Sequence, residues 1–172
     1  MMNTNGQINW HTKLRVSAGF CILLGVLRII SCFISFSLTQ PFAFGLDEPL
    51  LSGAHMSIFL GVVAIIIFTS TWQIFAGIYG VRRWGEPKKS ASVAAIAGVL
   101  ALFDGVFIIG VFVLWIQQGL FSMETQLPTV LLMPLTLIFV GSIAVFMYTH
   151  SAYTYALQIR AKRENSTLET GK

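Results

Sequence analysis

Two residues of opposite charge, Arg28 and Asp104, each stand alone in a long apolar run of the sequence. An ionisable side chain in mid-membrane costs roughly 2.5–3.5 kcal/mol on insertion scales, so it is expected to have a partner or a function. Arg28 lies thirteen residues after Arg15, and Asp104 lies fifteen after Lys89. These separations are about 20 and 22 Å along a helix. If both helices start from the same side of a membrane, the two charges reach one depth, and we predict a direct ion pair.

Three further polar residues fall at comparable depths. Gln73 precedes Arg82 by nine residues, and Tyr148 and His150 precede Arg160 by twelve and ten. At 1.5 Å per residue these separations are about 14, 18 and 15 Å. The sequence therefore predicts a buried polar layer made of Arg28, Asp104, Gln73, Tyr148 and His150.

Three interpretations of this layer remain open. In the first, the Arg28–Asp104 pair fixes the register of two helices and has no other role. In the second, the layer binds an ion, a proton or a small polar substrate, with Asp104 as the titrating group. In the third, one of the charges contacts another subunit.

The helices that must position these residues are visible as four apolar runs, at residues 16–38, 56–81, 91–116 and 129–157. The whole chain is 55% hydrophobic and only 10% charged, whereas soluble domains carry about 25% charge. Each run exceeds the 18 or so apolar residues that a membrane helix needs, and helices satisfy their own backbone groups in lipid. We predict an all-α integral membrane four-helix bundle over 16–158, with an N-terminal tail at 1–15 and a disordered tail at 159–172.

Small and polar residues recur at helical spacing along each run, which predicts the face that packs inside the bundle. Such stripes let membrane helices approach closely and place polar groups in contact. The stripes are Ser17, Cys21, Gly25, Arg28, Cys32 and Ser35 on the first run; Thr69, Gln73, Ala76 and Gly80 on the second; Ala94, Ala97, Ala101 and Asp104 on the third; and Gly141, Ala144, Tyr148, Ser151 and Tyr155 on the fourth.

Every Lys and Arg except Arg28 falls on one side of a four-span chain, and the loops on the other side contain none. Basic loops stay cytoplasmic, so we expect both termini on the cytoplasmic side of the cell membrane. The net charge of +4 is then explained by orientation, and nucleic acid is not expected as a partner. The basic loop holding Arg82, Arg83, Lys88 and Lys89 could also bind anionic lipid headgroups.

No pattern of residues points to catalysis or to a cofactor. The serine-hydrolase, phosphate-binding and zinc-protease motifs do not occur. The three histidines, His11, His55 and His150, fall at different depths, so neither a haem nor a metal site is expected. We expect a non-enzymatic accessory or assembly subunit, forming a homo-oligomer or binding another membrane protein. The alternative is a small oligomeric transporter or channel that uses the Arg28 and Asp104 layer; a membrane-embedded lipid or quinone enzyme is a third.

Overall fold

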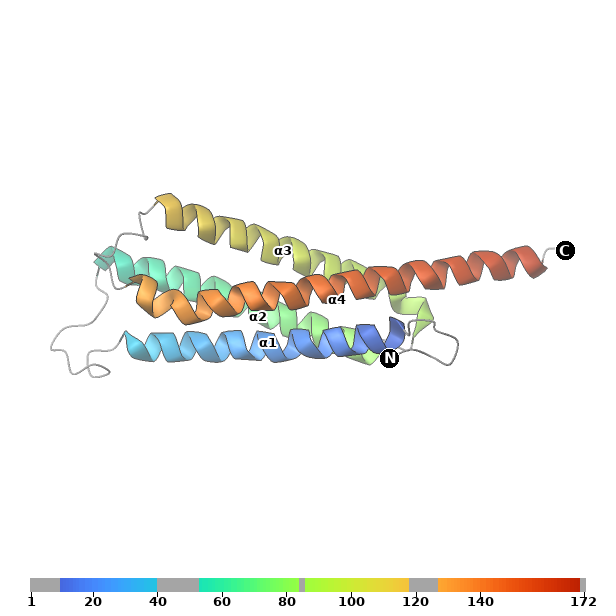
Figure 1. Cartoon of the computed structure of the whole chain (residues 1–172), viewed down its shortest axis with the longest axis horizontal. Coiled ribbons are helices and arrows are strands. Elements are labelled where there is room, and N and C mark those ends of the chain that lie inside the picture. Colours follow the sequence, from blue (N-terminus) through green and yellow to red (C-terminus); the bar gives the residue numbers. More distant parts are fainter. Residues whose placement is uncertain (1–9, 40–52, 84–85, 118–126, 171–172) are drawn as a thin grey trace.

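The computed structural model describes residues 10–39, 53–83, 86–117 and 127–170, and these residues form four long helices without a strand. The helices are α1 (Trp10–Leu38), α2 (Gly53–Arg83), α3 (Ser90–Gln117) and α4 (Leu127–Thr170). A short 3-10 helix, η2 (Pro87–Lys89), precedes α3. The helices lie side by side, and α1 begins at the end of the molecule toward which α4 ends (Figure 1). The predicted all-helical bundle is confirmed.

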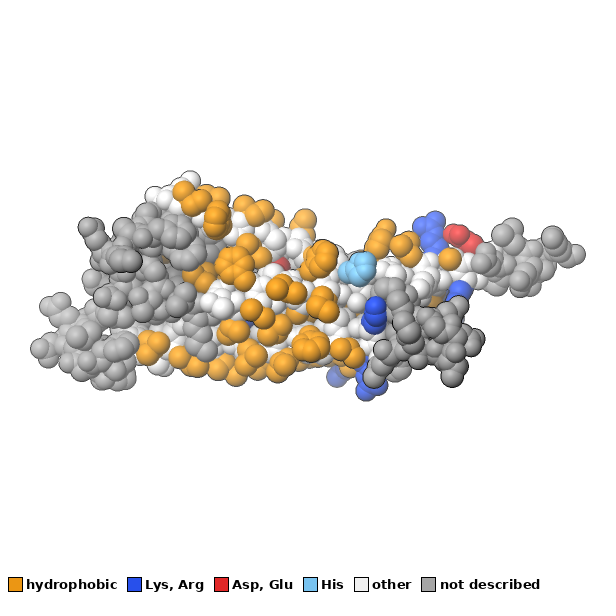
Figure 2. Space-filling view, in the orientation of Figure 1, with side chains coloured by type: hydrophobic (Ala, Val, Ile, Leu, Met, Phe, Trp, Pro, Cys, Tyr) orange, Lys and Arg blue, Asp and Glu red, His pale blue; other side chains and the backbone are white. Residues whose placement is uncertain are grey.

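All four helices are long and apolar enough to cross a membrane. The apolar spans are Thr12–Leu38, Met56–Arg83, Ser90–Gly110 and Pro134–Glu164. Large apolar side chains cover the face of the bundle seen in Figure 2, and the Lys and Arg side chains gather toward the end where α1 begins and α4 ends. We call this the basic end. An apolar exterior of this extent suits lipid as the surrounding solvent.

The predicted inward faces are fully buried on three of the four helices. All six stripe residues of the first run, all four of the second and all five of the fourth are buried; on α3, Ala97 and Asp104 are buried, whereas Ala94 and Ala101 are partly exposed. The small residues bring α1 and α2 close together. A Cβ atom on Gly77 would lie 2.8 Å from the carbonyl oxygen of Ala18.

The helices form a bundle in which α1 packs on α2 and α4, while α3 packs chiefly on α4 and less on α2. Two apolar clusters fill its interior. The basic-end core comprises Leu14, Ala18, Cys21, Ala76, Val93, Ala97, Leu100, Ala144, Val145, Tyr148, Ala152 and Tyr155. The far core comprises Cys32, Phe59, Val62, Val63, Ile66, Phe107, Leu135 and Ile138. On every helix, the level of Arg28 separates the two cores.

Helix α3 diverges from its neighbours toward its C-terminal end (Figure 1). From Ile109 to Gln117, every residue whose side chain the structure describes is exposed. Ile109, for example, is 65% exposed. The side chains described on this part of α3 therefore face away from the bundle.

Two helix boundaries differ from the sequence-based prediction by more than three residues. The tail at 159–172, expected to be disordered, continues α4 as far as Thr170. Its residues include good helix formers such as Ala161, Lys162 and Arg163, and Arg160 donates to Glu164 one turn later, a pairing that supports a helix. At the other end of the chain, α1 begins at Trp10, so residues 10–15 of the predicted tail are helical. Residues 1–9 of that tail lie outside the described residues.

Candidate functional site

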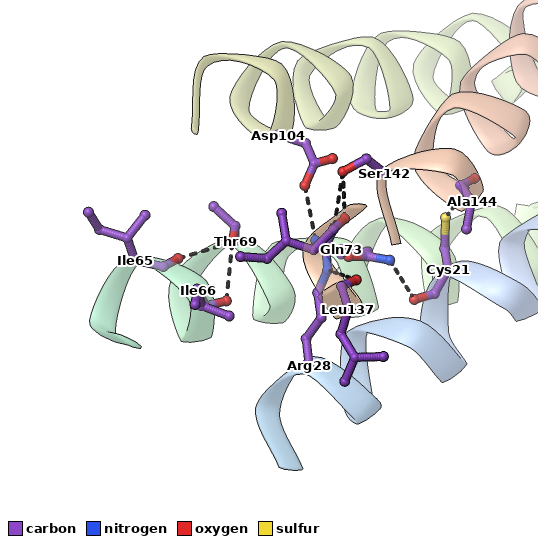
Figure 3. Close-up of polar contacts among 11 residues, drawn as sticks. Cys21, Arg28, Ile65, Ile66, Thr69, Gln73, Asp104, Leu137, Ser142 and Ala144 are labelled. Atoms are coloured by element: carbon purple, nitrogen blue, oxygen red, sulfur yellow. Dashed lines mark hydrogen bonds and ion pairs between the residues drawn. The ribbon is translucent and has the colours of Figure 1, made fainter. Parts of the chain in front are cut away.

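The candidate site is built around Arg28, whose side chain is 1% exposed. The side chain extends from α1 between α2 and α4 toward α3 (Figure 3). Room for the guanidinium comes from Gly141 on α4, because a Cβ atom there would lie 2.6 Å from the Arg28 Cζ atom. A stripe of small residues thus serves as the seat of the largest fully buried side chain.

One nitrogen of the guanidinium, Nη1, connects α1 with α2 and α3. It donates to Gln73 Oε1 at 2.7 Å and to Asp104 Oδ1 at 3.0 Å. Asp104 is 3% exposed, so the ion pair is shielded from the surroundings on both sides. The ion pair predicted from the matching depths of Arg28 and Asp104 is therefore present. It joins α1 and α3, the two long helices that pack least on each other.

The other two nitrogens connect α1 with α4. Arg28 Nε donates to the carbonyl oxygen of Leu137 at 3.2 Å, and Nη2 donates to the carbonyl oxygen of Ile138 at 2.5 Å. Nη2 also donates to the Ser142 hydroxyl at 3.3 Å. Ser142 in turn donates to the Ile138 carbonyl at 2.7 Å, which fixes its hydroxyl as an acceptor for the arginine.

A guanidinium has five N–H donors, and Arg28 makes five hydrogen bonds. Each N–H therefore has an acceptor within the chain. The acceptors come from all three of the other helices. Pairing and full hydrogen bonding offset much of the cost that an isolated buried charge would incur on leaving water.

Gln73 connects the Arg28 side chain to the main chain of α1 by a second hydrogen bond. Its side chain is fully buried. While its Oε1 accepts from Arg28, its Nε2 donates to the carbonyl oxygen of Cys21 at 3.1 Å. The Cys21 thiol donates to the carbonyl oxygen of Ala144 on α4 at 3.4 Å. The amide of Gln73 is thus oriented by groups on both sides.

Two residues predicted for the layer lie elsewhere. Tyr148 is buried, but its hydroxyl donates to the carbonyl oxygen of Ala76 at 2.9 Å and belongs to the basic-end core. His150 is exposed on α4, so its expected place in the layer is wrong. Residues two apart on a helix point about 200° away from each other, and α4 turns Tyr148 inward.

The sequence-based prediction missed the acceptors on α4. Ser142 follows the predicted stripe residue Gly141 and lies at the level of Arg28, so it could have been predicted from the sequence. The carbonyl groups of Leu137 and Ile138 could not, because every residue has a carbonyl group.

The predicted basic loop divides into paired and exposed bases. Arg83 contacts Glu86 at 2.6 Å, and Lys89 contacts the same carboxylate at 3.9 Å. Arg82 and Lys88 are exposed, and neither is seen in an ion pair within the described part of the chain.

Among the described residues, no group of three or more His, Cys, Asp and Glu side chains is arranged to hold a metal ion. The chemistry that the layer offers is hydrogen bonding and charge neutralisation. Comparison with known protein families, with curated proteins and with solved structures found no match for this chain.

Proposed function

We propose that this protein is a non-enzymatic membrane protein that acts through helix contacts, as an accessory or assembly subunit. The observation that carries the proposal is the hydrogen bonding of Arg28, whose five N–H groups are all used inside the chain. An arginine that binds a substrate must offer a donor to it. Arg28 instead joins all four helices, so its role is to maintain their packing and thereby the shape of the outer surface of the bundle.

We place the contact with a neighbouring subunit on the C-terminal half of α3. Membrane helices associate through close packing and polar contacts, since lipid is as apolar as the side chains. Ile109, Phe112 and Ile116 are all exposed, on the part of α3 that diverges from its neighbours (Figure 1). A helix from a second copy or from another membrane protein would pack against these side chains.

We further propose that both termini face the cytoplasm and that the protein resides in the cell membrane. Support comes from the distribution of charge. Lys13 and Arg15 at the start of α1, Arg82 and Arg83 at the end of α2, and Arg160 on α4 all belong to one end of the bundle. Basic residues flanking membrane spans are retained on the cytoplasmic side.

Cysteine cross-linking tests the proposed interface directly. Ile109→Cys on α3 should form a disulfide-linked or reagent-linked adduct in native membranes. Phe33→Cys on α1 is the matched control, because Phe33 is 63% exposed and lies as far beyond Arg28 as Ile109 lies beyond Asp104. Native mass spectrometry of the wild-type chain in mild detergent should show the same complex. A monomer, together with equal cross-linking at both positions, would contradict the proposal.

A small transporter is the second candidate, and one observation favours it. A carboxylate can accept about four hydrogen bonds, and within the described residues Asp104 is seen to accept only the one from Arg28. The spare oxygen is where a proton or cation would bind. Ion and proton flux into proteoliposomes decides between the two: flux that Asp104→Asn abolishes supports transport, and no flux above empty liposomes supports the assembly role.

A further inference from the structure

A shallow apolar groove runs along the outward face of α2. Its volume is about 550 Å³, within the range of roughly 300–1,000 Å³ that ligand sites occupy. Among the described residues of its lining, Thr71 carries the one hydroxyl, which donates to the carbonyl oxygen of Ile67 at 2.8 Å, so these residues present mainly hydrocarbon. Its walls are Ala64, Ile67, Phe68, Thr71, Trp72 and Phe75.

A row of aromatic rings continues the groove toward the basic end. The ring centroids of Trp72 and Phe75 lie 5.5 Å apart, and those of Phe75 and Tyr79 lie 6.4 Å apart. The Arg83 guanidinium carbon lies 6.0 Å from the centre of the Tyr79 ring. The apolar surface of α2 is thus continuous from the groove to the last turn of the helix, where the charges begin.

Arg82 lies on the same stripe of α2 as the groove. It follows Phe75 by seven residues, which is nearly two full turns, so the two side chains point within about 20° of each other. The distance along the helix is about 10 Å from Phe75 and about 15 Å from Trp72, and one leaflet's hydrocarbon is about 15 Å thick. Arg82 is exposed, whereas its neighbour Arg83 is held by Glu86.

We infer that this face of α2 is a binding site for an anionic phospholipid. The lipid's phosphate contacts Arg82, with Lys88 of the connection to α3 as the second exposed base, and one acyl chain follows Tyr79 and Phe75 into the groove beside Trp72. The charge at one end and the hydrocarbon along one leaflet's depth match the two parts of such a lipid.

Charge argues against a second copy of the chain as the occupant. Two copies that met on this face with a shared membrane orientation would bring Arg82 against Arg82 across a two-fold axis. Like charges placed together in this way oppose association. The inference does not rest on the proposed function, because the groove lies on α2 and the proposed subunit contact lies on α3.

Native mass spectrometry of the full chain tests this site. The protein is released from micelles containing phosphatidylglycerol or phosphatidylcholine with the same acyl chains. We expect phosphatidylglycerol to be retained several-fold more than phosphatidylcholine. Arg82→Gln should remove most of that preference. Lys162→Gln is the matched control, because it removes the same charge from an exposed position on α4 and should leave the preference intact.

A second variant tests the groove itself. Thr71→Trp fills the groove with an indole ring and should lower the retention of both lipids, whatever their headgroup. Equal retention of the two lipids by the wild-type chain would overturn the inference, as would equal losses in the Arg82 and Lys162 variants. A dimer that carries no lipid and is lost in Thr71→Trp would also overturn it, by identifying a second copy as the occupant.

Discussion

The two halves of the bundle, on either side of the arginine layer, are held together in different ways. In the basic-end half, hydrogen bonds join helices through the main chain: Tyr148 donates to Ala76, and Thr149 donates to the carbonyl oxygen of Ala97 at 3.0 Å. Its core is rich in alanine. The far core instead packs large side chains such as Phe59 and Phe107, and every interhelical hydrogen bond described above lies at the arginine layer or on its basic side.

The difference shows what holds a bundle together in lipid. Burying an apolar side chain between helices gains little when lipid offers an equally apolar environment, so close approach and polar contacts carry more of the stability. The basic-end half has both close approach and polar contacts, and its four helices stay packed together. In the half that relies on bulky side chains, α3 diverges from its neighbours toward its C-terminal end (Figure 1). The ion pair attaches α3 to α1 at the boundary between the two halves.

The largest effect is expected where the halves meet. Arg28→Met keeps an unbranched apolar stem and removes the charged guanidinium, which leaves the Asp104 carboxylate and the Gln73 amide oxygen buried without their donor. Removing one partner of a buried ion pair costs about 3–5 kcal/mol. We expect a loss of this size in the free energy of unfolding, measured by denaturation in detergent.

The double variant Arg28→Met with Asp104→Leu tests whether the loss comes from the unpaired carboxylate. Replacing both charges by apolar residues is often neutral, so the double variant should recover most of the stability that Arg28→Met loses. Wild-type stability in Arg28→Met alone would show that the layer does not hold the two halves together.

A smaller effect separates the two halves of α2. Gly77→Ala in the basic-end half should cost about 1–3 kcal/mol, the usual penalty for overpacking, because the new methyl group would meet the Ala18 carbonyl. Gly61→Ala is the control in the far half, where a Cβ atom has nothing within 4 Å. It should be neutral or slightly stabilising, since alanine favours a helix. Equal losses in the thermal denaturation of both variants would contradict the contrast.

The smallest effect tests the main-chain hydrogen bonds of the basic-end half. Tyr148→Phe removes only the hydroxyl that donates to Ala76, and such bonds in membranes contribute about 0.6–1.7 kcal/mol. Tyr153→Phe provides the control on α4, because Tyr153 is 60% exposed. The two variants are compared by their melting temperatures in one detergent. A loss no larger in Tyr148→Phe than in Tyr153→Phe would mean that ring packing alone holds this half.

The ion pair at the centre of the site could be predicted from the amino-acid sequence. Arg28 and Asp104 are each the sole charge in a run long enough to cross a membrane, and counting residues from the basic ends placed them at one depth. Gln73 also followed from depth and from its place on a stripe. His150 shows the limit of that reasoning, because depth alone does not say toward which side of a helix a residue points.

Three properties of each helix could be predicted from the amino-acid sequence alone: the presence of an apolar span, its approximate place in the chain, and the stripe that faces inward. These properties are local, since they depend on residue type and on 3.6 residues per turn. The tertiary structure alone shows that Gly141 makes room for the guanidinium, that Leu137 and Ile138 supply carbonyl acceptors, and that α3 diverges from its neighbours toward its C-terminal end. Those features depend on how far each helix is shifted and rotated against its neighbours, and packing between helices sets both.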